Sequence, residues 1–179
     1  SACRFIEVSS AEHLINPLRA VKSNNELALL TQAKQITLEV HKLTHQFLKP
    51  GVKTSAVKRF IDEAHRQLGA DNGSYFCAVQ FGEGTSHPHG VPGDPVLKEN
   101  QLILIDTGCQ VDGYHSDITR TYALDNVSMA IEETWAIEKE AQIAAFNAAR
   151  PGVPCSQVDK VARQILEHYG LGPDYKLPG

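Results

Sequence analysis

Residues 102–121 read LILIDTGCQVDGYHSDITRT. The four aliphatic residues that open this stretch predict a buried strand, and a carboxylate directly after such a strand is costly unless something neutralises it. The dipeptide Asp112-Gly113 suits a tight reversal of the chain. A chain that folds back there brings Asp117 almost opposite Asp106 on the neighbouring strand. Two carboxylates held together either share a proton or bind a cation.

The aspartate pair also permits plainer interpretations. Asp106 could cap a turn, and Asp117 could pair with Arg120 on a sheet surface. A cation held by oxygen ligands alone would be a hard or borderline ion such as Mn²⁺, Mg²⁺ or Zn²⁺. The residues by themselves leave these alternatives open.

Histidine is the second indication of chemistry. Residues 87–92 read HPHGVP, a proline-fixed loop that presents His87 and His89. A rigidly held imidazole suits a metal ligand or a proton donor near pH 7, whereas a solvated loop with incidental histidines is the alternative. Cys109 has no base beside it in the sequence and is expected to pack in the interior. Other histidines are expected at the surface or the edge of the core: His13, His41, His45, His65 and His168.

An internal repeat organises the rest of the chain. A shift of 101 residues places Pro50-Gly51-Val52 on Pro151-Gly152-Val153, and Gly69 on Gly170. In each copy the apolar spacing predicts a long helix, a Pro-Gly break and a shorter helix that ends at glycine. The expected buried face of the first copy comprises Leu29, Ala33, Ile36, Val40, Leu43, Phe47, Val57, Phe60, Ile61, Ala64 and Leu68.

The two copies differ after their helices. The first copy continues with strand-like runs at 74–81, 102–105 and 118–124, whereas the second has only nine residues after Gly170. The fold class is therefore α+β, a duplicated helix–helix–strands unit whose second copy lacks its strands. Helices with one apolar face need a sheet to cover them, so we expect this chain to stop before its fold is complete.

Composition narrows the classes of function. Apolar residues make up 42% of the 179-residue chain, too many for a disordered tail. The net charge of −4 and the lack of a basic cluster argue against a nucleic-acid partner, and no apolar run approaches a membrane span. The chain does not open with a secretion signal, and its four scattered cysteines form no Cys-x-x-Cys pair, which together favour a cytoplasmic location.

At these motifs the chain resembles the pita-bread metallopeptidases, the family of Xaa-Pro aminopeptidase, Xaa-Pro dipeptidase (prolidase) and methionine aminopeptidase. The motifs that carry the resemblance, which favours the proline-specific branch, are Arg19 to Glu26, the Lys-Pro-Gly break at 49–51, Pro88-His89-Gly90, Ile105-Asp106-x-Gly108, and Gly113 to Thr121.

The resemblance also implies a domain organisation. Residues 1–18 would be the connector from an absent amino-terminal domain, and residues 19–179 an incomplete pita-bread catalytic domain. The first repeat would cover about 19–125 and the truncated second repeat about 126–179.

A dinuclear metal site is the activity that the resemblance implies. Asp106 would chelate one metal and Asp117 would bridge both, while His89 would bind the substrate near the scissile peptide and stabilise the tetrahedral intermediate. Tyr114 is expected to contact the substrate together with His89. The cofactors would be two divalent ions, Mn²⁺ first and Zn²⁺ or Co²⁺ as alternatives, which generate a hydroxide that attacks the bond before proline.

The implied substrate is a proline-containing peptide or dipeptide, and the full-length protein is expected to be a homodimer. The family's other ligands, one histidine and two glutamates, have no matching position here, so we expect this chain to bind metal weakly and to hydrolyse peptides poorly. Two alternatives are a binding module that has lost catalysis and a creatinase-like hydrolase that works without metal. Retention of both aspartates argues against each of them.

Overall fold

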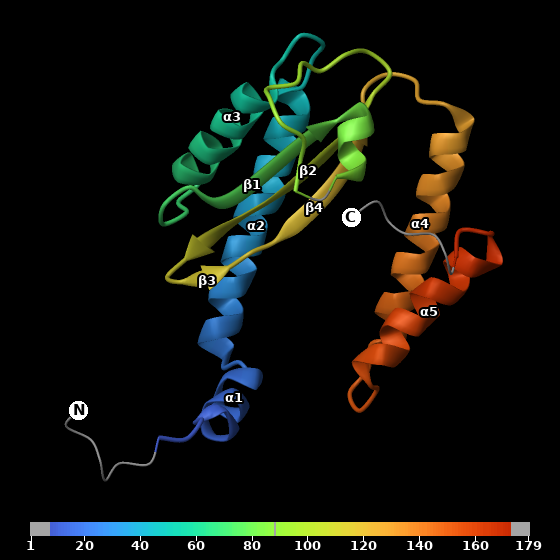
Figure 1. The fold of residues 1–179 in the computed structure, drawn as a ribbon. Coiled ribbons are helices and arrows are strands. Elements are labelled where there is room, and N and C mark those ends of the chain that lie inside the picture. The colour runs from blue at the N-terminus through green and yellow to red at the C-terminus, as the bar shows by residue number, and fades with distance from the viewer. Residues whose placement is uncertain (1–7, 88, 173–179) are drawn as a thin grey trace.

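The computed structural model describes residues 8–87 and 89–172. In chain order the elements are α1 (Glu12–Ala20), α2 (Asn24–Phe47), α3 (Thr54–Gln67), β1 (Ser74–Phe81), the 3-10 helix η1 (Gly82–Ser86), β2 (Leu102–Val111), β3 (Tyr114–His115), β4 (Ile118–Ala123), α4 (Met129–Ala148) and α5 (Cys155–His168). A small sheet packs on α2 and α3, and the α4–α5 pair lies beside it (Figure 1). This mixture of helices and antiparallel strands confirms the predicted α+β class.

The sheet is built around β2. Strand β1 pairs antiparallel with one edge of β2, and β3 and β4 pair antiparallel with the other edge. Asp112 and Gly113 form the two-residue turn between β2 and β3, both with positive φ (47° and 79°), as the predicted reversal requires. Strands β3 and β4 are two parts of one returning strand, separated by Ser116 and Asp117.

The core lies between one face of the sheet and helices α2 and α3. Alternate residues of β2 enter it: Ile103 and Ile105 are buried, whereas Leu102 and Leu104 are half-buried. Only one face of this strand is therefore fully covered within the described residues. Asp106 has the same parity as Leu104, so it points to the face opposite α2 and α3. Apolar members of the core from the predicted helix faces are Ala33, Ile36, Val40, Val57, Ile61 and Ala64.

The helices confirm the internal duplication. Helix α3 begins at Thr54 and α5 at Cys155, and the ends of these helices are offset by the same 101 residues. Helices α2 and α4 likewise end at equivalent positions. The Pro-Gly breaks match in conformation, since Gly51 and Gly152 have φ of 90° and 85°.

The two helix pairs differ in burial. Helices α2 and α3 contribute most of the core, whereas among the described residues α4 buries Ala141 alone and α5 buries none. Large exposed apolar side chains on this second pair and its flanks are Met129, Trp135, Ile143, Phe146 and Tyr169. In the described part of the chain no strand follows α5.

The amino-terminal segment contributes little to the core. Helix α1 has no buried residue among those described, and it covers part of the predicted connector. Residues 1–7 of that connector and residues 173–179 of the predicted second repeat lie outside the described residues. None of the described helices combines the length and apolarity needed to cross a membrane.

Candidate metal centre

Strand pairing brings Asp106 and Asp117 onto the same face of the sheet. Asp106 lies opposite Thr119, whose Oγ1 donates a hydrogen bond of 2.7 Å to Asp106 Oδ1. The register is the same on both sides of the break between β3 and β4, and it places Asp117 opposite Gly108. The two carboxylates are therefore diagonal neighbours, which agrees with the expectation that Asp117 lies almost opposite Asp106. Gly108 has no side chain, and a Cβ there would lie 2.7 Å from Cε1 of the Tyr75 ring on β1.

The electrostatics of the pair reflect this proximity. Asp106 is half-buried and Asp117 is exposed. Partial desolvation of its carboxyl raises the pKa of Asp117, and the negative charge of Asp106 and a hydrogen bond with it raise this pKa further. A divalent cation would relieve the repulsion between such like charges.

The donor set fits part of a metal site. Two carboxylates suit a hard or borderline divalent ion. Across residues 8–87 and 89–172, however, no group of three or more His, Cys, Asp or Glu side chains could hold a metal. Within the described residues the pair could therefore provide two carboxylate ligands, without a third side chain beside them.

A buried network of hydrogen bonds around Ser116 fixes the chain next to Asp117. Ser116 N donates to the Cys109 carbonyl at 3.0 Å, and Ser116 Oγ accepts from Cys109 N at the same distance. The Ser116 hydroxyl also lies 2.8 Å from Thr37 Oγ1 on α2. On the other side, a Cβ at Gly108 would lie 1.9 Å from the Ser116 carbonyl oxygen. This close approach therefore requires glycine at position 108.

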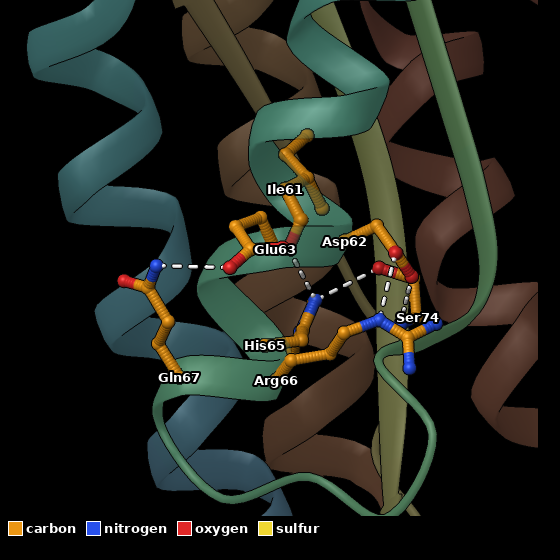
Figure 2. Close-up of polar contacts among 7 residues, drawn as sticks. All are labelled: Ile61, Asp62, Glu63, His65, Arg66, Gln67 and Ser74. Carbon is orange, nitrogen blue, oxygen red and sulfur yellow. Dashed lines mark hydrogen bonds and ion pairs between the residues drawn. The ribbon is translucent and has the colours of Figure 1, made fainter.

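These hydrogen bonds continue through Thr37 to the buried His65, whose contacts with Ile61 and Ser74 are shown in Figure 2. Its Nε2 lies 3.1 Å from Thr37 Oγ1, and its Nδ1 lies 3.1 Å from the Ile61 carbonyl and 2.9 Å from Ser74 Oγ. A neutral ring satisfies these contacts by donating from Nδ1 and accepting at Nε2. Burial lowers the pKa of His65 to about 4, which keeps the ring neutral at physiological pH.

The expectation that His41 and His65 lie at the surface or the core edge is wrong. His65 is 0% exposed and His41 is 4% exposed. His41 ties α2 to β4, because its Nδ1 lies 2.7 Å from the Tyr122 hydroxyl and its Nε2 lies 2.9 Å from the Ile118 carbonyl. The helical spacing could have predicted this burial, since His65 follows Ile61 by one turn on the buried face of the helix.

His89 and Asp106 line the same cleft, which has a volume of about 570 Å³. His89 itself is exposed, and Pro88 lies outside the described residues. Cys77 also lines the cleft, but burial raises the pKa of its thiol to about 11. A thiol that stays protonated is a poor metal ligand. The other ionisable side chains that line this cleft are Lys58, His89 and Asp106.

Tyr114 lies elsewhere. Its hydroxyl donates a 2.9 Å hydrogen bond to Glu26 Oε1, and its ring lines a separate cleft with Arg19 and Lys22. The structure does not bring Tyr114 together with His89 and Asp106, so its role in substrate binding stays a prediction.

Comparison with known proteins identifies the family. Residues 28–177 match the model of metallopeptidase family M24. Over 158 residues the chain is 34% identical to an uncharacterized peptidase of Staphylococcus aureus (strain USA300), covering 88% of this chain and 45% of the relative. The chain thus spans about half the length of the curated relatives that it matches.

Solved structures give the same result. The X-Pro aminopeptidase from Thermotoga maritima superposes with a TM-score of 0.85 at 29% identity, covering 90% of this chain and 46% of that one. The prolidase from Pyrococcus furiosus gives a TM-score of 0.87 at 28% identity, covering 92% of this chain and 49% of the prolidase chain. These neighbours confirm the predicted pita-bread fold, and the family implies a divalent metal cofactor. The chain belongs to metallopeptidase family M24.

Proposed function

We propose that this chain forms part of a peptidase that hydrolyses the bond before proline. The observation that carries the proposal is the placement of Asp106 and Asp117 on the sheet face that α2 and α3 leave open, with His89 at the cleft that Asp106 lines. The printed names of its structural neighbours, an X-Pro aminopeptidase and a prolidase, support the choice of proline-containing peptides as substrates.

Asp106 and Asp117 would hold two divalent ions, Mn²⁺ in the first instance and Zn²⁺ or Co²⁺ as alternatives. Asp106 would bind one ion and Asp117 would bridge both. When bound, such ions act as Lewis acids and lower the pKa of water to near neutrality. The hydroxyl of Thr119 holds Asp106 Oδ1 by a 2.7 Å hydrogen bond, which fixes the orientation of the carboxylate.

His89 would bind the peptide beside the scissile bond. It is exposed on the cleft, so its imidazole can donate a hydrogen bond to a carbonyl oxygen that gains negative charge in the transition state. We also propose that the substrate is a proline-containing peptide and that the full-length protein is a homodimer.

The ligand set of this chain is incomplete. No third metal-ligating side chain joins the aspartate pair in the part of the chain that the structure describes. We infer that the 179-residue chain alone binds metal weakly and hydrolyses peptides poorly. The remaining ligands, a histidine and two glutamates according to the family resemblance, would come from residues outside it.

An assay of the longest gene product that contains this chain tests the proposal. With Mn²⁺ present, it should hydrolyse Xaa-Pro dipeptides or longer Xaa-Pro peptides, and Asp117→Ala should abolish this activity because it removes the bridging carboxylate. Glu133→Ala, which removes an exposed carboxylate on α4, is the matched control and should leave activity unchanged. An active Asp117→Ala enzyme would refute the metal assignment. Titration of the isolated chain with MnCl₂ should show weak, substoichiometric binding.

A further inference from the structure

The segment that carries His89 is anchored by a carboxylate that lies beyond it. Asp94 Oδ1 accepts hydrogen bonds from Thr54 Oγ1 at 2.9 Å and from Ser55 N at 2.8 Å, and its Oδ2 accepts from Ser55 Oγ at 2.8 Å. Lys53, the N-cap residue of α3, makes no side-chain capping bond among the described residues. Asp94 therefore takes the place of the N-cap side chain, from a position 40 residues after Thr54 in the sequence.

Backbone hydrogen bonds reinforce this anchor. Thr54 N donates to the Pro95 carbonyl at 3.0 Å, and Leu97 N donates to the Val52 carbonyl at 2.8 Å. Residues 94–97 consequently lie against the turn that joins α2 and α3, and the chain after His89 has a fixed end point.

A second anchor acts before His89. Gln80 on β1 is 4% exposed, and its Nε2 donates a hydrogen bond to the His87 carbonyl. The same carbonyl accepts a bond of 2.9 Å from Gly90 N, so the amide of Gln80 and a turn around His89 converge on one oxygen. Gln80 also lines the cleft that contains His89 and Asp106.

The side-chain amide of Gln80 carries a penalty in the free energy of folding, which a purely structural role does not explain. Its buried Oε1 has no hydrogen-bond partner among the described residues. An unpaired buried carbonyl oxygen disfavours folding, and an apolar side chain of similar length would avoid that penalty. The polar contact that this amide does make is with the segment that presents His89.

We propose that Gln80 and Asp94 are positioning residues for His89. Gln80 fixes the chain on one side of His89 and Asp94 fixes it on the other, so that the imidazole is held at the cleft that Asp106 lines. The anchoring stands on the geometry alone, whereas its consequence for catalysis rests on the proposed peptidase function.

Hydrogen exchange of the 179-residue chain, followed by NMR, tests the anchoring. In Gln80→Met the amide of Gly90 should exchange about tenfold faster or more, because its acceptor loses a fixed position. Amides of Ile103 and Ile105 in the core should exchange as slowly as in the parent chain, or more slowly, since the unpaired oxygen is gone. Asp94→Ala should accelerate Gly90 and Ser55, and Asp94→Asn, which keeps one acceptor oxygen, should restore most of the protection.

Glu99→Ala is the control, because Glu99 is an exposed carboxylate five residues after Asp94. Unchanged exchange at Gly90 in both Gln80→Met and Asp94→Ala would overturn the anchoring.

Kinetics of the metal-loaded peptidase test the consequence for catalysis. Gln80→Met and Asp94→Ala should lower kcat about tenfold while KM changes little, because a misplaced imidazole weakens transition-state contacts more than ground-state binding. Faster exchange at Gly90 with unchanged kcat would overturn the positioning role. The Asp117→Ala assay reports on the peptidase proposal independently of these two variants.

Discussion

Glycine at position 108 decides how closely the returning strand approaches β2. A side chain there would collide with the Ser116 carbonyl and with the ring of Tyr75. The sequence identifies Asp106 and Asp117 as a pair, because they flank a turn dipeptide after an aliphatic run. The need for glycine depends on a backbone contact across the hairpin, which no spacing in the sequence reveals.

We predict that Gly108→Ala destabilises the protein by about 2 kcal/mol, since overpacking a fitted site typically costs that much. The variant should also bind Mn²⁺ more weakly, because the displaced Ser116 carries Asp117 with it. Urea unfolding and metal titration measure the two effects.

Gly84→Ala is the matched control for this variant. A Cβ at Gly84 would meet Val91 Cγ2 at 3.5 Å, an ordinary contact, so its stability should change little. Equal stabilities of the two variants would contradict the collision at position 108.

His65 should make stability depend on pH. Its pKa falls from 6.5 to about 4 on folding, chiefly through burial, although the carbonyl of Ile61 and the charge of Asp62 oppose the change. Between about pH 6.5 and pH 4, His65 binds a proton in the unfolded chain but not in the folded chain. The free energy of unfolding is therefore highest above about pH 6.5 and decreases as the pH falls toward 4. The expected loss is on the order of 3 kcal/mol.

Urea midpoints between pH 7 and pH 4 measure this effect. His65→Gln should remove that part of the pH dependence, while His168→Gln, at an exposed position, should not. The prediction fails if the parent chain and His65→Gln lose stability equally over this range.

At the scale of elements, periodicity and the repeat predicted the main helices and strands. The offset of 101 residues holds for the bounds of α3 and α5 because each copy has the same break and the same terminal glycine. Helix α1 was not predicted, since it buries none of its described residues and contains Pro17. The anchors on the His89 segment also escaped prediction, because Gln80 and Asp94 act through contacts that only the tertiary fold creates.

Helix α2 begins with a reciprocal cap whose strength can be measured. Ser23 N donates to Glu26 Oε2 at 2.6 Å, and Ser23 Oγ accepts from Glu26 N at 3.4 Å. We expect Ser23→Ala to lower the free energy of unfolding by about 1 kcal/mol. Ser128→Ala at the start of α4 should have almost no effect, because Ser128 makes no side-chain capping bond within the described part of the chain. Similar losses from both variants in denaturant unfolding would contradict this difference.

At the scale of the whole molecule, α2, α3 and the sheet form a well-buried part, whereas the α4–α5 pair is largely exposed. The core cluster joins α2 and α3 to the sheet, whereas α4 and α5 contact chiefly each other. Phe146 on α4 is 75% exposed. Because resistance to local opening follows buried apolar contact, the two parts should differ in protection from solvent.

We expect amides of α4 and α5 to exchange at least about tenfold faster than those of α2 and β2 in native-state hydrogen exchange followed by mass spectrometry. Helix α3, which has the same length as α5, provides an internal comparison. Equal protection of α3 and α5 would show that the second pair is stabilised by contacts other than those described.

The long-range cap on α3 has a consequence for the order of synthesis. Thr54, the first residue of this helix, leaves the ribosome 40 residues before the carboxylate that caps it. At ordinary elongation rates that interval lasts roughly 2 to 8 seconds. The first turn of the nascent helix therefore lacks its capping carboxylate until Asp94 has been synthesised. The rate of translation sets the earliest time at which the His89 segment can be anchored.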